Sequence, residues 1–235
     1  MGSDDERIRD AIKNTEILRL PKQTLSTFGV TNIYYYLVTE PVYSELTKDA
    51  IETVIREGRV IAEKPRVVTP YYLAHLDGFS PEARKYFDML VKMQGANAPG
   101  LFYTYKNEPK ELSIVSDNLL SVVKKLDDQI DKRGDSLTSI IRGEDDLWDV
   151  SLMKFIYELT RNSLQNNLRQ MGTRGLLDTD AGGVPADVRL RIDELFKRVL
   201  RGEYEPYELK AELDRWGLFE EYEDRFLSFF RKKRW

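Results

Sequence analysis

Residues 145–171 constrain the fold most, because this segment contains neither glycine nor proline. Its apolar residues recur mostly at steps of three and four positions, from Leu147 through Phe155 to Met171. That spacing is typical of one buried face of a helix. A helix of this length extends about 40 Å at 1.5 Å per residue. We therefore predict a single long helix that joins a strand-containing first half to a helical second half.

Strand signals are concentrated in the first half of the chain, residues 1–116. Residues 32–41 are β-branched and aromatic and are apolar at consecutive positions, as is typical of a central strand. Glu57 and Gly58 separate two short apolar runs and predict a tight hairpin turn. Further strands are predicted at residues 16–20, 24–28, 66–69, 101–105 and 111–115, the last two as a hairpin around residues 106–109. Because most connections are short, we expect an antiparallel or mixed sheet.

Helix signals occur in both halves. In the first half, Pro70 and Pro81 each follow a residue that can cap a helix, and a short helix is expected at residues 4–14. In residues 117–235, helices are predicted at residues 119–133, 135–142, 185–200 and 205–216 and from residue 219 onward, with no strand. The predicted fold class is α+β, with a small sheet and packed helices in residues 1–116 and an all-helical half in residues 117–235. The two halves are expected to share one core.

The residue types that are rare or absent exclude several kinds of chemistry. The chain has 235 residues, no cysteine and one histidine, His75. Thiolate metal sites, disulfides and cysteine nucleophiles are therefore excluded, together with metal sites that need two histidines of one chain. Neither a glycine-rich dinucleotide fingerprint nor a phosphate-binding P-loop is present. We predict no cofactor and no metal site.

The second half of the long predicted helix carries the most site-like group of side chains. Amides and guanidinium groups crowd together at Arg161, Asn162, Gln165, Asn166, Asn167, Arg169 and Gln170, and Arg174 follows in a glycine-containing turn. Such groups hydrogen-bond carboxylates, phosphates or exposed backbone. A solvated helix face more usually carries glutamate and lysine. Two interpretations stay open: a ligand or partner site, and a polar contact between packed elements.

Tyrosine is the other excess, with 13 in the chain. In the segment of three consecutive tyrosines, Tyr35 points to the opposite face of its strand from its two neighbours. Tyr35, Tyr72 and His75 are further candidate site residues. Any Ser-His-Asp triad would have to use His75, but no nucleophile elbow exists, and a partly buried structural histidine is the favoured interpretation. The tyrosines are interpreted first as core, then as a partner surface, then as a stacking surface for bases.

These patterns favour a non-catalytic protein that acts through protein contacts and forms homo-oligomers. One alternative is an enzyme or sensor that binds a small anionic ligand at the Arg/Asn/Gln-rich helix face. Another is a weak binder of single-stranded nucleic acid, which the net charge of −4 disfavours. No apolar run approaches the length of about 18 residues that suggests a membrane span, and the first residues are acidic and polar. We therefore expect a cytoplasmic protein.

Overall fold

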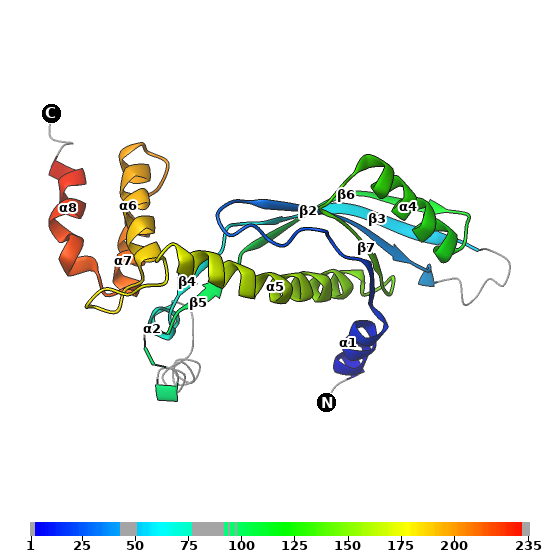
Figure 1. Cartoon of the computed structure of the whole chain (residues 1–235), viewed down its shortest axis with the longest axis horizontal. Helices are drawn as coiled ribbons and strands as arrows, with labels where there is room; N and C mark the ends of the chain where they lie inside the picture. Colours follow the sequence, from blue (N-terminus) through cyan, green and yellow to red (C-terminus); the bar gives the residue numbers. More distant parts are fainter. Residues whose placement is uncertain (1–2, 43–50, 77–91, 94, 97, 232–235) are drawn as a thin grey trace. The chain divides into compact units, whose positions relative to one another are not determined.

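The computed structural model describes residues 3–42, 51–76, 92–93, 95–96 and 98–231 (Figure 1). The chain forms two compact units, and each consists of two segments. The first unit contains Met1–Lys64 and Tyr103–Asn167, and the second contains Pro65–Phe102 and Leu168–Trp235. These limits differ from the boundary after residue 116 that the sequence suggests, because strands and helices from both halves build the first unit.

A mixed five-stranded sheet is the centre of the first unit. Its strands are β1 (Glu16–Arg19), β2 (Thr31–Thr39), β3 (Thr53–Ala62), β6 (Tyr105–Val115) and β7 (Thr138–Arg142). They lie in the order β1-β7-β2-β3-β6. The pair β2–β7 is parallel, and the other three pairs are antiparallel. The α+β class and the mixed sheet are thus as predicted, and residues 31–39 form the central strand.

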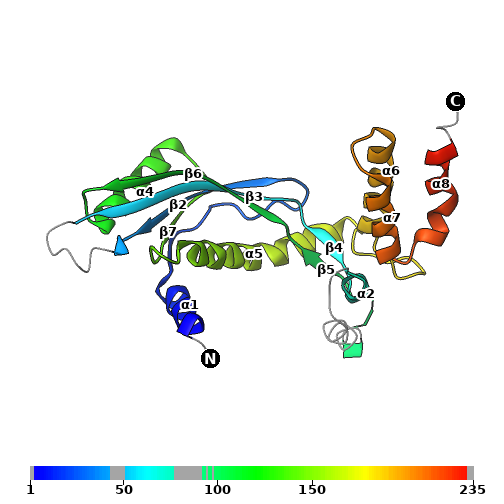
Figure 2. The ribbon, with the colours of Figure 1, turned by 180° about the vertical axis from the view of Figure 1, so that it is seen from behind.

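Two helices cover opposite faces of this sheet (Figures 1 and 2). Helix α4 (Leu119–Arg133) packs against the face that carries Val38 and Ile140. Helix α5 (Trp148–Thr173) packs against the other face, with Phe155 in the same apolar cluster as Leu37. Because successive strand residues point to opposite faces, β2 contributes to both clusters. That double burial accounts for its consecutive apolar residues.

The long predicted helix is confirmed, because α5 runs without interruption for 26 residues. Its buried side chains include Leu152, Phe155, Ile156 and Leu159, at the expected steps of three and four. The helix α1 (Ser3–Asn14) precedes β1 in the same unit, as expected. The local spacing of apolar residues was sufficient for these elements, since a helix uses only contacts between near neighbours in sequence.

Four local predictions were wrong. Residues 138–142 form the strand β7 instead of a helix, and β7 is inserted between β1 and β2. Strand β3 runs straight through Glu57 and Gly58, and β6 runs straight through the expected turn at residues 106–109. Each of these segments pairs with a strand distant in sequence, and such pairing overrides the local turn signals. The expected strand at residues 24–28 is also absent.

The second unit combines a small sheet with helices. It contains β4 (Arg66–Val68), α2 (Pro70–Ala74), β5 (Gly100–Phe102), α6 (Ala186–Leu200), α7 (Pro206–Arg215) and α8 (Phe219–Arg231). One apolar cluster joins α6, α7 and α8 and contains Phe196, Trp216 and Phe226. Thr69 accepts a hydrogen bond from the Tyr72 amide and caps α2, as predicted. The helix expected after Pro81 lies outside the described residues.

Candidate functional site

The predicted helix-face residues are distributed over both units. In the first unit, Arg161, Asn162 and Gln165 are exposed on α5, and Asn166 is half-buried. In the second unit, Arg169 and Arg174 are exposed. None of these six side chains lines the cavity that is described below. Their role as a ligand or partner site stays a prediction.

One member of this polar run, Asn167, is completely buried. Its amide group lies 3.0 Å from the Thr27 hydroxyl and 3.0 Å from the Tyr103 hydroxyl. With the amide nitrogen turned toward the carbonyl oxygens of Leu25 at 3.1 Å and Ser163 at 3.3 Å, every polar atom of the group has a suitable partner. Asn167 therefore attaches α5 to the loop between β1 and β2, which is the polar contact between packed elements that the sequence left open.

Tyr35 and the neighbouring tyrosines of the first unit are held by the fold. Tyr35 is buried beneath α5, and its hydroxyl donates a hydrogen bond of 3.0 Å to Asn107. Burial raises the pKa of Tyr35, and it also raises the pKa of Tyr103 and Tyr105. The rings of Tyr103 and Tyr105 stack with centroids 6.3 Å apart. These rings pack within the unit, in agreement with the first-ranked interpretation of the tyrosines as core.

Tyr72 and His75 lie in the second unit. The Tyr72 hydroxyl donates a hydrogen bond of 3.0 Å to Glu212, and burial raises the pKa of Tyr72, with a further contribution from the Glu212 charge. His75 is exposed, and its Nδ1 lies 2.8 Å from the carbonyl oxygen of Tyr71. The His75 ring also lies against the Tyr71 ring, with centroids 4.4 Å apart. The structure therefore places His75 at the end of α2 as an exposed residue rather than the partly buried one that we expected.

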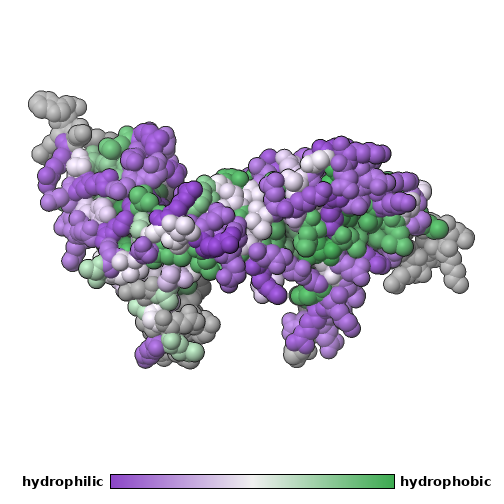
Figure 3. All heavy atoms as spheres, viewed as in Figure 1, coloured by the Kyte–Doolittle hydropathy of each residue, from purple (hydrophilic) through white to green (hydrophobic). Residues whose placement is uncertain are grey.

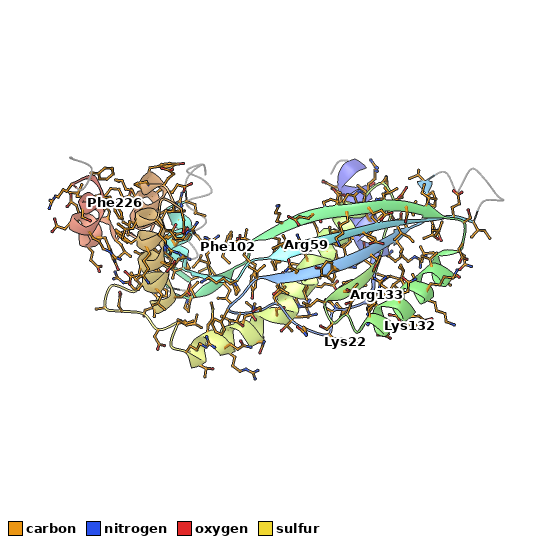
Figure 4. The ribbon with its side chains drawn as sticks, turned by 90° about the horizontal axis from the view of Figure 1, so that it is seen from above. Lys22, Arg59, Phe102, Lys132, Arg133 and Phe226 are labelled. Atoms are coloured by element: carbon orange, nitrogen blue, oxygen red, sulfur yellow. The ribbon has the colours of Figure 1, made fainter. Side chains whose placement is uncertain are left out.

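A hollow of about 330 Å³ lies on the sheet face that carries α4, and we call it the sheet hollow. It is lined by Tyr34, Tyr35, Tyr36, Glu57, Gly58, Lys110, Arg133, Asp135 and Thr138. Figure 4 looks onto this face and shows Arg133 at the end of α4 and Arg59 on the sheet. Because α4 ends at Arg133, it leaves the neighbouring part of the sheet uncovered. Of the nine predicted site residues, the sheet hollow includes Tyr35.

The turn after α4 holds two charged side chains at the sheet hollow. Gly134 adopts a left-handed conformation with φ of 68°, and the Asp135 amide donates a hydrogen bond to the carbonyl oxygen of Ile130 at 3.2 Å. This bond closes a Schellman turn, which fixes the residues on either side of the glycine. Arg133 and Asp135 are exposed and line the same hollow. The sequence predicted the end of the helix at Gly134, but it gave no sign that these two residues face the sheet.

The second notable surface of the first unit is the edge strand β6. Among the described residues, β6 pairs with β3 alone, so its other edge is open. Leu112 is 58% exposed and Ile114 is 52% exposed. They alternate along the strand and therefore share one face. The alternation in residues 110–115 was visible in the sequence, but only the sheet order shows that this strand lies at an edge. Figure 3 shows that hydrophobic residues also gather over the sheet below α4.

Glu108, in the first half of β6, provides a pH-dependent signature of this region. Its carboxylate accepts hydrogen bonds from Lys106 at 2.8 Å and from Arg59 at 3.1 Å, and these partners lower its pKa to about 2. We expect the Glu108 carboxyl signal to titrate near pH 2 in carbon-detected NMR. Because the pKa of Glu108 is lower in the folded protein than in the unfolded chain, the ion pair stabilises the fold at pH values above the unfolded-state pKa. This stabilisation is lost as the pH falls toward 2.

The variants Lys106→Gln and Lys106→Arg separate the causes of this pKa. Lys106→Gln removes the first of the two cations, so the Glu108 midpoint should rise. Lys106→Arg keeps the charge and should preserve the low value. A Glu108 midpoint near 4.5 in the unmodified protein would contradict the ion pair, since that is the ordinary value for the group.

Comparison with known proteins gives no further assignment. No protein-family model matches the chain, and neither a curated protein nor a solved structure matches it. Within the described parts of the chain, no group of three acidic or histidine side chains is placed to hold a metal ion. Among the same residues, no helix is both long enough and apolar enough to cross a membrane.

Proposed function

We propose that this protein acts through protein contacts as a homo-oligomer and that β6 is the contact strand. The observation that supports this proposal most directly is the open edge of β6, with Leu112 and Ile114 exposed at alternate positions. An edge strand presents unpaired backbone N–H and C=O groups that add a strand from another chain. We propose a non-catalytic role, since this surface consists of backbone hydrogen-bonding groups and aliphatic side chains, which bind another chain but catalyse no reaction.

The two ends of β6 differ in a way that favours pairing through its second half. Pro109 has no backbone N–H and lies at the register shift in the β3–β6 pair, where β6 has one extra residue, and such features protect an edge from pairing. The following residues, 111–115, contain no proline and include the two exposed aliphatic side chains. The unprotected part of the edge is therefore the part that carries the apolar surface.

A second copy of the chain is the occupant that this surface suits best. If two β6 strands pair antiparallel about a two-fold axis at Ser113, Leu112 of each copy lies opposite Ile114 of the other. Both cross-strand pairs are then aliphatic and lie on the same face, which is the arrangement that stabilises a sheet. A two-fold contact of this kind closes on itself and forms a dimer rather than a fibre.

Sedimentation equilibrium or light scattering tests the dimer. The expected mass is twice the 27.4 kDa of one chain. Ile114→Lys places a charge opposite the aliphatic Leu112 of the other copy and should weaken dimerisation at least tenfold. Leu18→Lys is the matched control, because Leu18 is 41% exposed but lies on β1, at the opposite edge of the sheet. A monomer at all concentrations, or equal weakening by both variants, would count against the proposal.

The absence of cysteine from the chain permits a direct test of the contact strand. Ser113→Cys introduces one thiol at the expected two-fold axis, so oxidation or a short bifunctional maleimide should give a covalent dimer. Leu18→Cys introduces one thiol on β1, the opposite edge of the sheet, and should give little covalent dimer. Cross-linking of Leu18→Cys in place of Ser113→Cys would reject β6 as the contact strand.

A further inference from the structure

The sheet hollow contains equal numbers of positive and negative side chains. Lys110 and Arg133 are cations, and Glu57 and Asp135 are carboxylates. They come from β3, β6, α4 and the turn after α4. Four separate segments therefore bring opposite charges together in the hollow. The sheet and the Schellman turn set the backbone positions of these groups.

None of these four charged groups forms an ion pair with another described residue. Lys110 lies over the Tyr34 ring, with its Nζ 5.1 Å from the centroid. By contrast, the nearby Arg59 is already paired with Glu108, and Asp131 is paired with Arg19. Unlike Arg59 and Asp131, the charges that line the hollow therefore keep hydrogen-bonding capacity that is not used within the described chain.

The balance of charge restricts the ligand. An anion bound to Arg133 would also lie close to Glu57 or Asp135, which repel it, and a simple cation would meet Arg133 and Lys110. The carbonyl groups at the end of α4 further disfavour a purely anionic ligand. A small molecule with both a carboxylate and an ammonium group avoids both repulsions. The hollow volume of about 330 Å³ is at the small end of the range of ligand pockets.

We propose that the sheet hollow binds a small zwitterion of the amino-acid class. The Arg133 guanidinium receives the carboxylate, since its planar fork matches two carboxylate oxygens. Asp135 and Glu57 receive the ammonium group. The ring of Tyr34, with Lys110 over it, forms a wall for the ligand side chain. This site is independent of the dimer contact, because it lies on the α4 face whereas Leu112 and Ile114 share the face of Arg56 and Val54, opposite α4.

Amide NMR titration with each of the twenty amino acids, up to 10 mM, tests the proposal. We expect at least one amino acid to give saturable shifts at residues 34–36, 57–58 and 133–138. The matched N-acetyl derivative lacks the positive charge, and the matched amino-acid amide lacks the negative charge. Both derivatives should bind at least tenfold more weakly, because the first leaves Asp135 and Glu57 without a partner and the second leaves Arg133 without one.

Two variants at the hollow and one beside it complete the test. Arg133→Gln and Asp135→Asn should each weaken binding at least tenfold, and both side chains are exposed, so the fold should be retained. Lys132→Gln removes an adjacent charge that does not line the hollow, and it should leave the affinity unchanged. The proposal is overturned if no amino acid shifts these amides, if either derivative binds as tightly as the parent, or if Lys132→Gln weakens binding as much as Arg133→Gln does.

Discussion

Glu212→Gln is expected to destabilise the second unit by about 3–5 kcal/mol, the usual effect of removing one partner from a buried ion pair. Glu212 is 6% exposed, and Arg191 donates to its Oε1 at 2.7 Å. Trp216 Nε1 also donates to Oε1, at 3.3 Å, while Tyr72 donates to Oε2 at 3.0 Å. The glutamine amide keeps the shape but removes the charge, so the Arg191 guanidinium remains in the interior without a counter-ion.

Urea unfolding followed by tryptophan fluorescence measures this loss, because Trp216 lies in the apolar cluster of the second unit. Glu194→Gln is the matched control. Glu194 pairs with Arg201 at 2.7 Å, but both side chains are 52% exposed, so its loss should change stability by about 1 kcal/mol or less. An unfolding midpoint for Glu212→Gln equal to that of Glu194→Gln would show that the buried network does not hold the unit together.

Gly58→Ala is expected to destabilise the first unit by about 3 kcal/mol, at the upper end of the range for overpacking. A Cβ atom at position 58 would lie 2.2 Å from the Tyr35 hydroxyl oxygen and 2.4 Å from Tyr35 Cζ. The two residues are direct partners in the pairing of β2 with β3. Because Tyr35 is 2% exposed and its hydroxyl donates to Asn107, the ring has no alternative position of similar packing.

A double-mutant cycle distinguishes this clash from an effect on the β3 backbone. Tyr35→Ala removes the ring and is destabilising by itself, but Gly58→Ala should then add little, since its obstacle is gone. Gly29→Ala is the control substitution. Its Cβ would meet one atom, the Ser26 hydroxyl oxygen, at an ordinary 3.4 Å. If Gly58→Ala were as harmless as Gly29→Ala, or equally harmful with and without the Tyr35 ring, the proposed packing would be wrong.

The Gly58 position also explains why one turn prediction failed. Glycine after glutamate between two apolar runs is a common hairpin signal, and the sequence offers no way to distinguish it from a glycine beneath an aromatic ring. The distinction depends on Tyr35, which lies 23 positions earlier in the chain and reaches Gly58 through strand pairing. Likewise, the sequence of residues 138–142 resembles a short helix. These residues form a strand because they pair with β1 on one side and β2 on the other.

The candidate sites show the same difference between what local sequence patterns predict and what contacts between distant segments decide. The polar run on α5 was evident from composition, yet the structure separates its exposed arginines and amides from the buried Asn167. The sheet hollow was not predicted, because its residues Glu57, Lys110 and Arg133 belong to segments that are distant in sequence. None of them belongs to a recognisable sequence motif, since they share a location in the folded structure rather than a regular spacing along the chain.

The sequence alone determined the α+β class, the central strand at residues 31–39, and the helices α4, α5, α6, α7 and α8, with Gly134 marking the end of α4. These features depend on the spacing of apolar residues, on helix caps and on turn residues, all of which act between residues a few positions apart. The tertiary structure decided the order of the strands, the open edge at β6 and the meeting of four charged side chains, Arg133 among them, that form no ion pair with another described residue. Those features depend on pairing between distant segments, and the free energy of such pairing is not contained in any local pattern.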